Sequence, residues 1–346
     1  MNKKQNSAEA EERELPHSLL LQRGATALDA VSLRRALADL DGAALQVPEL
    51  VDYQQFYGFD HLLGDATHQI KKLKLGDEHL AVHYFLPPRI VGHVMLCHGY
   101  YDHVGLYGHL LRYLLQHDLA VVAYDQLGHG LSSGAAATID SFDRYVEATL
   151  AVWQFACADL SVSAEQSWHW LGQSMGGAVL LETLHQQPDL PIAELVLFAP
   201  LVRPYGWWLS QMAFAIAKLT VEQRPRRITR NAENLEFMHL QHADPLQARI
   251  LPVAWVQAMV DWFQRFEQYP AAELAPKIIQ GHRDRTVSWR HNYKLLGERY
   301  PQTEWCILPE ASHHLVNESD ILRGKMFAWL DQHCQWKSAH NSDLSA

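Results

Sequence analysis

Residues 171–177 read Leu-Gly-Gln-Ser-Met-Gly-Gly and follow the apolar stretch Trp168-His169-Trp170. A Gly-x-Ser-x-Gly pentapeptide therefore stands where a β-strand is expected to end. A serine in this motif occupies a sharp, strained turn between a strand and a helix, where the flanking glycines let neighbouring backbone pass without a clashing Cβ. The small and apolar residues at 176–184 fit a helix packed tightly against a sheet. The motif thus predicts a strand–turn–helix unit that presents Ser174 as a nucleophile.

The pattern around this unit favours an α/β fold. From Leu80 onward, short β-rich runs alternate with helical stretches, which is typical of a parallel sheet covered by helices on both faces. The predicted strands span 81–85, 92–97, 120–124, 167–171, 193–198, 277–280 and 304–308. The predicted helices span 27–40, 107–116, 141–160 and 320–335.

The chain divides into six segments by composition. We expect polar, disordered tails at 1–14 and 337–346, and an N-terminal helical extension at 15–71. Residues 72–200 and 276–336 are expected to form the two parts of the α/β core. Between them, 201–275 lacks strand patterns and is rich in apolar and aromatic residues, which predicts a helical cap over the serine-bearing edge of the sheet.

Charge and composition exclude several kinds of partner. The 29 basic and 39 acidic residues give a net charge of −10, which disfavours nucleic acid or an anionic membrane held by charge, and no basic patch stands out. The four cysteines form no CxxC pair, which predicts reduced, mostly buried thiols. Because no signal-peptide pattern and no long apolar run occurs, we expect the chain in the cytoplasm.

A serine nucleophile needs a histidine base that is oriented by a carboxylate. On a nucleophile elbow the expected order along the chain is serine, then an acid, then histidine. Asp284 lies in the loop after the strand predicted at 277–280, and His313 and His314 lie in the loop after the last predicted strand. Because functional groups gather at the carboxyl ends of parallel strands, these residues and Ser174 are expected to meet at one edge. Position alone leaves either histidine as the base.

The oxyanion of a tetrahedral intermediate also needs hydrogen-bond donors. The first is usually the amide after the nucleophile, here that of Met175, and the second comes from a loop after an earlier strand. The turn His98-Gly99-Tyr100 follows the strand predicted at 92–97, so the amide of Tyr100 is the expected second donor.

Other chemistries fit these residues less well. A binuclear metallohydrolase would need a ligand at the position of Tyr100, and no His-Glu-x-x-His zinc motif is present, so we expect no metal. Asp125 follows a strand and precedes two glycines, but it also precedes Ser174, and that order favours a structural turn.

These motifs resemble those of the α/β-hydrolase superfamily, in particular its branch of monoacylglycerol lipases and bacterial lysophospholipases. The matching segments, over roughly 75–336, are 98–103, 125–132, 172–177, 281–287 and 311–318. The resemblance implies a mostly parallel central sheet flanked by helices, with a helical cap inserted after the sixth strand. It also implies that His313 is the base, because the family's histidine follows Ala-x and precedes an apolar pair by one residue.

The sequence departs from the branch in two places. Tyr100 and Tyr101 are bulkier than the residues that often follow His-Gly, and His314 stands where the branch carries an acidic residue. The tyrosines are expected to narrow the acyl pocket, and the change to histidine puts any supporting role of that position in question.

The resemblance implies a cofactor-free serine hydrolase that cleaves carboxylic esters of lipid-like substrates, such as a monoacylglycerol or a lysolipid, through an acyl-enzyme. Tyr101, Trp207, Trp208 and Phe214 are expected to line the acyl cleft, although the cap aromatics can equally form a packed interior. An apolar cap also favours light peripheral contact with the inner face of the membrane. A short-chain carboxylesterase, a thioesterase, an acyltransferase and a non-catalytic binding protein stay open as alternatives, as does the oligomeric state.

Overall fold

The computed structural model describes residues 28–40, 44–45, 49–207, 221–226 and 230–336. The tails expected at 1–14 and 337–346 lie outside these ranges, as do Trp208 and Phe214.

The sheet contains eight strands in the order β1-β2-β4-β3-β5-β6-β9-β10. Only β2 runs antiparallel to its neighbours, and the remaining pairs are parallel. The strands are β1 (Thr67–Leu75), β2 (Glu78–Leu86), β3 (Gly92–Cys97), β4 (Leu119–Tyr124), β5 (Trp168–Gln173), β6 (Ile192–Phe198), β9 (Lys277–Gly281) and β10 (Glu304–Leu308). All seven predicted strands are present in this sheet.

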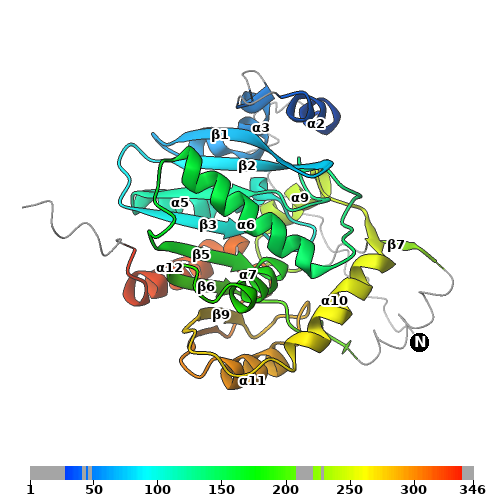
Figure 1. The fold of residues 1–346 in the computed structure, drawn as a ribbon, viewed down its shortest axis with the longest axis vertical. Helices are drawn as coiled ribbons and strands as arrows, with labels where there is room; N and C mark the ends of the chain where they lie inside the picture. The colour runs from blue at the N-terminus through cyan, green and yellow to red at the C-terminus, as the bar shows by residue number, and fades with distance from the viewer. Residues whose placement is uncertain (1–27, 41–43, 46–48, 208–220, 227–229, 337–346) are drawn as a thin grey trace, which may run out of the picture.

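Strand β1 was not predicted, and it changes the expected boundary of the N-terminal extension. It pairs with β2 along its whole length, so the division at residues 71 and 72 falls inside a strand. Helices α2 (Ala30–Ala38), α3 (Glu49–Tyr57) and α4 (Phe59–Leu62) precede β1, as Figure 1 shows beside the upper edge of the sheet. Tyr53, Tyr57 and Phe59 of these helices are buried in the same apolar cluster as the sheet.

Helices cover both faces of the sheet, as the alternating pattern predicts (Figure 1). One face packs against α5 (Gly108–Gln116) and α12 (Asp320–His333), whose leucines join a cluster with Val94, Leu96 and Val121. The other face packs against α6 (Phe142–Asp159), α7 (Met175–Gln186) and α11 (Trp289–Arg299). Because strand side chains alternate between faces, β3, β4 and β5 each contribute to both cores, and all three are buried throughout.

Between β6 and β9 the chain leaves the sheet, and we call residues 199–276 the insertion. It follows the sixth strand and contains α9 (Leu235–Ala243) and α10 (Val253–Phe266). It is not wholly helical, because β7 (Gln223–Pro225) and β8 (Ile250–Pro252) form a two-stranded antiparallel sheet. Helix α10 is anchored to the core, since Trp262 stacks on Phe142 and its indole N–H donates to Glu182 at 2.9 Å.

The parallel register brings the ends of six strands, β3, β4, β5, β6, β9 and β10, to one edge of the sheet. Cys97 lies opposite Gly172, Gly172 lies opposite Leu197, and Gly281 lies opposite Leu308. The loops after β3, β5, β6, β9 and β10 therefore leave from the same side, which is where the sequence places its candidate functional residues.

Candidate active site

Ser174 occupies the turn between β5 and α7 in a strained conformation, with φ 51° and ψ −114°. A non-glycine residue rarely adopts positive φ, so the surrounding structure must hold it there. The glycines of the motif explain how this turn fits. A Cβ on Gly172 would lie 2.7 Å from the amide nitrogen of Gly177, and a Cβ on Gly176 would collide with the carbonyl oxygen of Cys97.

Ser174, His313 and Asp284 form a continuous hydrogen-bonded chain. The Ser174 Oγ lies 2.9 Å from His313 Nε2, and His313 Nδ1 lies 2.7 Å from Asp284 Oδ2. The three residues come from the loops after β5, β10 and β9, and each is less than a tenth exposed. The arrangement gives each imidazole nitrogen one partner, which is the geometry that a serine nucleophile requires.

Asp284 is held as a carboxylate. Its Oδ1 accepts the amides of Thr286 at 2.8 Å and Val287 at 3.0 Å, and its Oδ2 accepts the side-chain amide of Gln280 at 3.1 Å. Burial acts to raise the pKa of Asp284, but the charge and hydrogen bond of His313 and the two backbone amides outweigh it, so this pKa lies below its ordinary value. An ionised Asp284 accepts a hydrogen bond from His313 Nδ1–H. The other nitrogen, Nε2, is then unprotonated and can accept a hydrogen bond from the Ser174 hydroxyl.

The loop that carries His313 is fixed from three sides. The His313 amide donates to the carbonyl of Asn231 in the insertion at 3.1 Å, and its carbonyl accepts from Gln173 Nε2 at 3.1 Å. Gly281 packs directly against the same loop, where a Cβ would collide with the carbonyl oxygen of Ser312. The imidazole is thus positioned by β5, β9 and the insertion together.

His98 orients the peptide group that ends in the Tyr100 amide. Its Nε2 accepts the amide of Gln126 at 2.9 Å, so its Nδ1 carries the proton and donates to the carbonyl of Gly99 at 2.8 Å. The amide of Asp102 donates to the same carbonyl at 3.1 Å. Because a trans peptide points its N–H opposite its carbonyl, these two bonds fix the direction of the Tyr100 amide. The amide of Met175 lies in the first turn of α7, where no intrahelical acceptor is available.

A second histidine–carboxylate pair supports this turn. His314 Nε2 lies 3.0 Å from Asp102 Oδ2, which also accepts the hydroxyl of Tyr107 at 2.9 Å, and that hydroxyl accepts the Gly99 amide at 3.0 Å. His314 is thereby connected to the loop after β3 and not to Ser174. One signal for this pair is visible in the sequence, since His314 stands where the resembling branch carries an acidic residue, and Asp102 supplies a carboxylate from the loop after β3.

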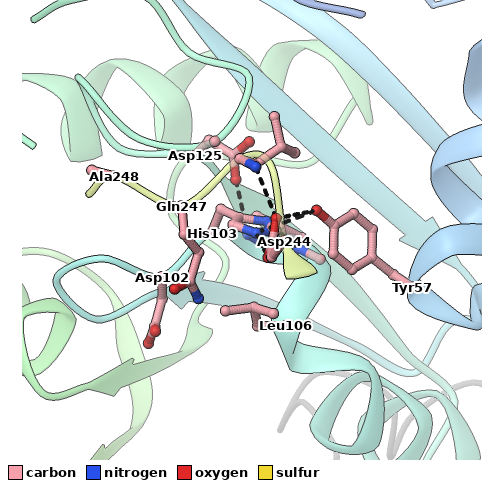
Figure 2. A network of polar contacts seen from close by, with 12 residues as sticks. Tyr57, Asp102, His103, Leu106, Asp125, Asp244, Gln247 and Ala248 are labelled. Carbon is pink, nitrogen blue, oxygen red and sulfur yellow. Dashed lines mark hydrogen bonds and ion pairs between the residues drawn. The ribbon is translucent and has the colours of Figure 1, made fainter. Parts of the chain in front are cut away.

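A third pair joins three parts of the chain, and the sequence did not indicate it. Figure 2 shows Asp244, which follows α9, between His103 from the loop after β3 and Tyr57 from α3. His103 Nε2 lies 2.7 Å from Asp244 Oδ2, and the Tyr57 hydroxyl donates to Asp244 Oδ1 at 3.0 Å. The Gly105 amide donates to His103 Nδ1 at 3.2 Å. The side chains of Tyr57, His103 and Asp244 are all buried, so the network joins extension, core and insertion in the interior of the protein.

Asp125 has the structural surroundings expected of it. Its carboxylate accepts the amides of Val104 and Leu131 at 2.8 and 2.7 Å, and Gly130, with φ 51°, approaches it so closely that any Cβ would collide. These bonds hold the loop after β4 against the loop after β3.

The residues expected to line an acyl cleft fall in different surroundings. Tyr101 lies on the loop after β3 with φ 70°, and the Arg226 guanidinium of the insertion stacks over its ring at 4.0 Å. Trp207 is 7% exposed and makes an edge contact with Phe263, which places it in packed interior. Trp208 and Phe214 lie outside the described residues.

Several general features of the chain complete this picture. Cys97, Cys157, Cys306 and Cys334 are free and buried, as the sequence predicts. Within the described ranges, no three histidine, cysteine or acidic side chains come together in a way that could hold a metal ion. Among the same residues, no helix is long and apolar enough to cross a membrane.

The sequence is similar to those of known hydrolases. The chain matches the family model of serine aminopeptidase, S33, over residues 88–320. It is 26% identical over 232 residues to a monoglyceride lipase of Mus musculus, covering 65% of this chain and 75% of that protein. It is 26% identical over 254 residues to a monoacylglycerol lipase of Mycolicibacterium smegmatis, covering 70% of this chain and 89% of that protein.

Solved structures show the same fold. A soluble variant of the monoglyceride lipase from Saccharomyces cerevisiae, in complex with a substrate analog, has a TM-score of 0.67 at 15% identity, over 79% of this chain and 97% of that one. The family model covers more than half of this chain, so the family is shown and not only the fold. The chain belongs to the serine aminopeptidase S33 family, and it is an ester-hydrolysing α/β-hydrolase of the monoacylglycerol lipase type.

Proposed function

We propose that the chain hydrolyses carboxylic esters of lipid-like alcohols, with a monoacylglycerol or a lysolipid as substrate, through a covalent acyl-enzyme on Ser174. The observation that carries the proposal is the hydrogen-bonded chain from Ser174 Oγ through His313 to Asp284, with contacts of 2.9 and 2.7 Å. The similarity to monoglyceride lipases supports the substrate class.

In the first half-reaction, Ser174 Oγ attacks the ester carbonyl carbon while His313 Nε2 accepts the hydroxyl proton. The carbonyl π electrons move to the oxygen, and the amides of Tyr100 and Met175 stabilise that oxyanion. When the intermediate collapses, the carbon–oxygen bond to the alcohol breaks, and His313 returns its proton to the departing alkoxide. Asp284 keeps the imidazole in one orientation and stabilises its cationic form.

In the second half-reaction, water replaces the alcohol. His313 removes a proton from the water as its oxygen attacks the acyl carbon, and the same two amides hold the second oxyanion. Breakdown of this intermediate releases the carboxylic acid and restores the Ser174 hydroxyl with the proton from His313. The two steps together consume one ester and one water and yield one acid and one alcohol.

We assign the insertion the role of a cap over the substrate. It supplies Asn231, which holds the His313 loop, and Arg226, which covers Tyr101 beside the proposed oxyanion donor. Trp255 of α10 stacks on Tyr100 at 3.6 Å, so an aromatic wall reaches from the insertion to the nucleophile's side of the sheet. An apolar wall at this place suits an acyl chain.

The test compares the native chain with Ser174→Ala and with Ser163→Ala, a matched control at an exposed serine. We expect a fluorophosphonate probe to label the native chain and the control but not Ser174→Ala. Activity on monoacylglycerols should fall by about 10⁴-fold or more in Ser174→Ala. Labelling at another residue, or activity within a few-fold of the native chain, would contradict the assignment.

A substrate panel then separates the alternatives. Glyceryl and p-nitrophenyl esters of increasing chain length distinguish a lipase from a short-chain carboxylesterase, while acyl thioesters and added alcohol acceptors report thioesterase and transferase activity. The family description adds aminoacyl p-nitroanilides, which an aminopeptidase would cleave. A preference for monoacylglycerols of medium or long chain is the expected result, and a preference for short-chain esters or anilides would contradict it.

A further inference from the structure

A pocket of about 600 Å³ lies next to the catalytic carboxylate and gathers four arginines. Arg283 and Arg285 flank Asp284 in the loop after β9, Arg290 belongs to the first turn of α11, and Arg230 comes from the insertion. Because sixty residues separate the first of them from the last, no basic patch stands out in the sequence, and the fold brings these arginines together. The concentration of positive charge stands out in a chain of net charge −10.

The acidic side chains in the wall of this pocket already have partners. Asp284 is bound to His313, and Glu233 pairs with Arg283 at 2.8 Å. Among the ion pairs of the described residues, none involves Arg230, Arg285 or Arg290. Four guanidinium groups and two carboxylates therefore line one pocket, which leaves a net positive charge that a bound anion would offset.

An aromatic platform holds part of the pocket in place. The ring centroids of His282 and Trp289 lie 4.3 Å apart, and the two rings stack with an interplanar angle of 11°. The Arg290 guanidinium lies 4.3 Å from the centroid of the Trp289 ring. A guanidinium stacked through its face keeps its N–H groups available at the edge. The contact with Trp289 restrains the exposed Arg290 side chain, so less conformational entropy is lost when it binds a ligand.

Further hydrogen-bond donors line the same wall. Ser288 and Ser312 both contribute to the pocket, and the Ser288 side chain caps no amide of α11. The first turn of α11 contains no acidic residue. No side chain of this turn therefore offsets the positive end of the helix dipole. These groups add neutral donors to the charge of the arginines.

We infer that this pocket binds a small molecule that carries a phosphomonoester group. Such a group has a charge near −2 and three terminal oxygens, so it can engage several guanidinium groups and a hydroxyl at once. The volume exceeds that of a phosphate alone and leaves room for the organic part of the ligand. Neither Ser174 nor the amide donors line the pocket, so the site goes beyond the proposed ester hydrolysis and does not depend on it.

The experiment measures phosphate binding to the full chain by titration calorimetry at constant ionic strength. Inorganic phosphate and glycerol 3-phosphate are the probes, glycerol is the uncharged control, and the Ser174→Ala variant removes any contribution from hydrolysis. We expect saturable binding of both anions, with Kd near or below about 1 mM. The double variant Arg285→Ala with Arg290→Ala should weaken binding by about 100-fold, because each charged hydrogen bond is worth roughly tenfold.

Two further variants sharpen the test. Glu233→Gln removes the carboxylate that pairs with Arg283, so it should tighten phosphate binding by a few-fold. Arg112→Ala removes an exposed arginine of α5, outside the pocket, and should leave the affinity unchanged. Equal losses in Arg112→Ala and in the double variant would show that only net charge matters, and would overturn the site.

A second arm distinguishes a soluble ligand from a lipid headgroup. The chain is floated with vesicles of phosphatidylcholine alone or with added phosphatidic acid, which carries the same phosphomonoester. Flotation that needs phosphatidic acid and is lost in the double variant assigns the site to a headgroup, whereas glycerol 3-phosphate binding without flotation assigns it to a soluble ligand. If neither arm shows saturable, arginine-dependent binding, the inference is wrong, whether or not the chain hydrolyses esters.

Discussion

Two buried histidine–carboxylate pairs of this molecule have the same contact length and different surroundings. His313 and His103 each lie 2.7 Å from their carboxylates, Asp284 and Asp244. They differ at the other imidazole nitrogen, because His313 meets the hydroxyl of Ser174, whereas His103 accepts a backbone amide. A carboxylate next to a histidine therefore does not define a catalytic pair. The group on the far nitrogen decides whether the imidazole can receive a proton from a nucleophile or only holds two loops together.

The largest expected effect separates the two histidines by function. His313→Ala should lower kcat on a monoacylglycerol by about 10⁴-fold to 10⁶-fold, because the base for both half-reactions is lost. His103→Ala should keep kcat within about tenfold when measured at a temperature where the variant is folded. Steady-state kinetics together with circular dichroism of both variants check the comparison. Comparable losses of kcat in two folded variants would contradict it.

The next effect concerns the carboxylates. Asp284→Asn keeps the shape of the side chain but removes the charge that holds the proton on His313 Nδ1, so kcat should fall by about 10⁴-fold. Asp244→Asn changes a carboxylate of the other pair in the same way, and kcat should change by less than tenfold. Fluorophosphonate labelling rates of the two variants provide an independent readout, since labelling requires the same activated serine.

The third prediction concerns stability, where the pair of His103 and Asp244 should matter more than it does for activity. Asp244→Ala leaves His103 and the Tyr57 hydroxyl buried without their acceptor, so the free energy of unfolding should decrease by about 3–5 kcal/mol. Asp189→Ala, at an exposed aspartate, is the matched control and should change it by less than about 0.5 kcal/mol. Urea denaturation checks both values. A large loss of kcat without a loss of stability in Asp244→Ala would move this pair into the chemistry.

Much of the central sheet could be predicted from the sequence, because the position of a strand depends on a local pattern of apolar residues. Strands β3 and β10 have the predicted bounds, since each is a short run of apolar or β-branched residues. Strand β1 was missed because its lysines hide the pattern, and only Ile70 in it is fully buried. A signal was nevertheless present, because Gly76-Asp77 forms a two-residue hairpin turn with φ 61° at the glycine.

The candidate triad was predictable for a related reason, and the supporting pairs were not. Ser174, Asp284 and His313 each lie within a few residues of the end of a parallel strand, so the sheet brings their loops to one edge. Asp244 instead lies in the insertion, 141 residues from His103, and their contact depends on how the insertion packs. The arginine pocket depends on the same packing. Sequence patterns predict positions relative to the sheet, but not which side chains of an insertion meet it.

The smallest expected effect concerns the pair beside the proposed oxyanion donor. Burial acts to raise the pKa of Asp102, but the charge and hydrogen bond of His314, the charge of His98 and the Tyr107 hydroxyl outweigh it and leave this pKa well below its ordinary value. A lowered carboxyl pKa stabilises the fold at every pH above the unfolded-state value of about 4, and this contribution is lost as the pH falls below it. Asp102→Asn should therefore cost about 2 kcal/mol at pH 7, and the cost should shrink below about pH 4.

The same substitution tests whether this pair acts on catalysis through position alone. Asp102 accepts from Tyr107, which in turn holds the Gly99 amide next to the Tyr100 peptide. Loosening that turn should lower kcat by about tenfold, well short of the loss from His313→Ala, because one oxyanion donor is misplaced and the base is intact. KM should change little. Urea unfolding from pH 3 to pH 7 and the split between kcat and KM measure the two parts, and a cost that grows as the pH falls would refute the assigned charge state of Asp102.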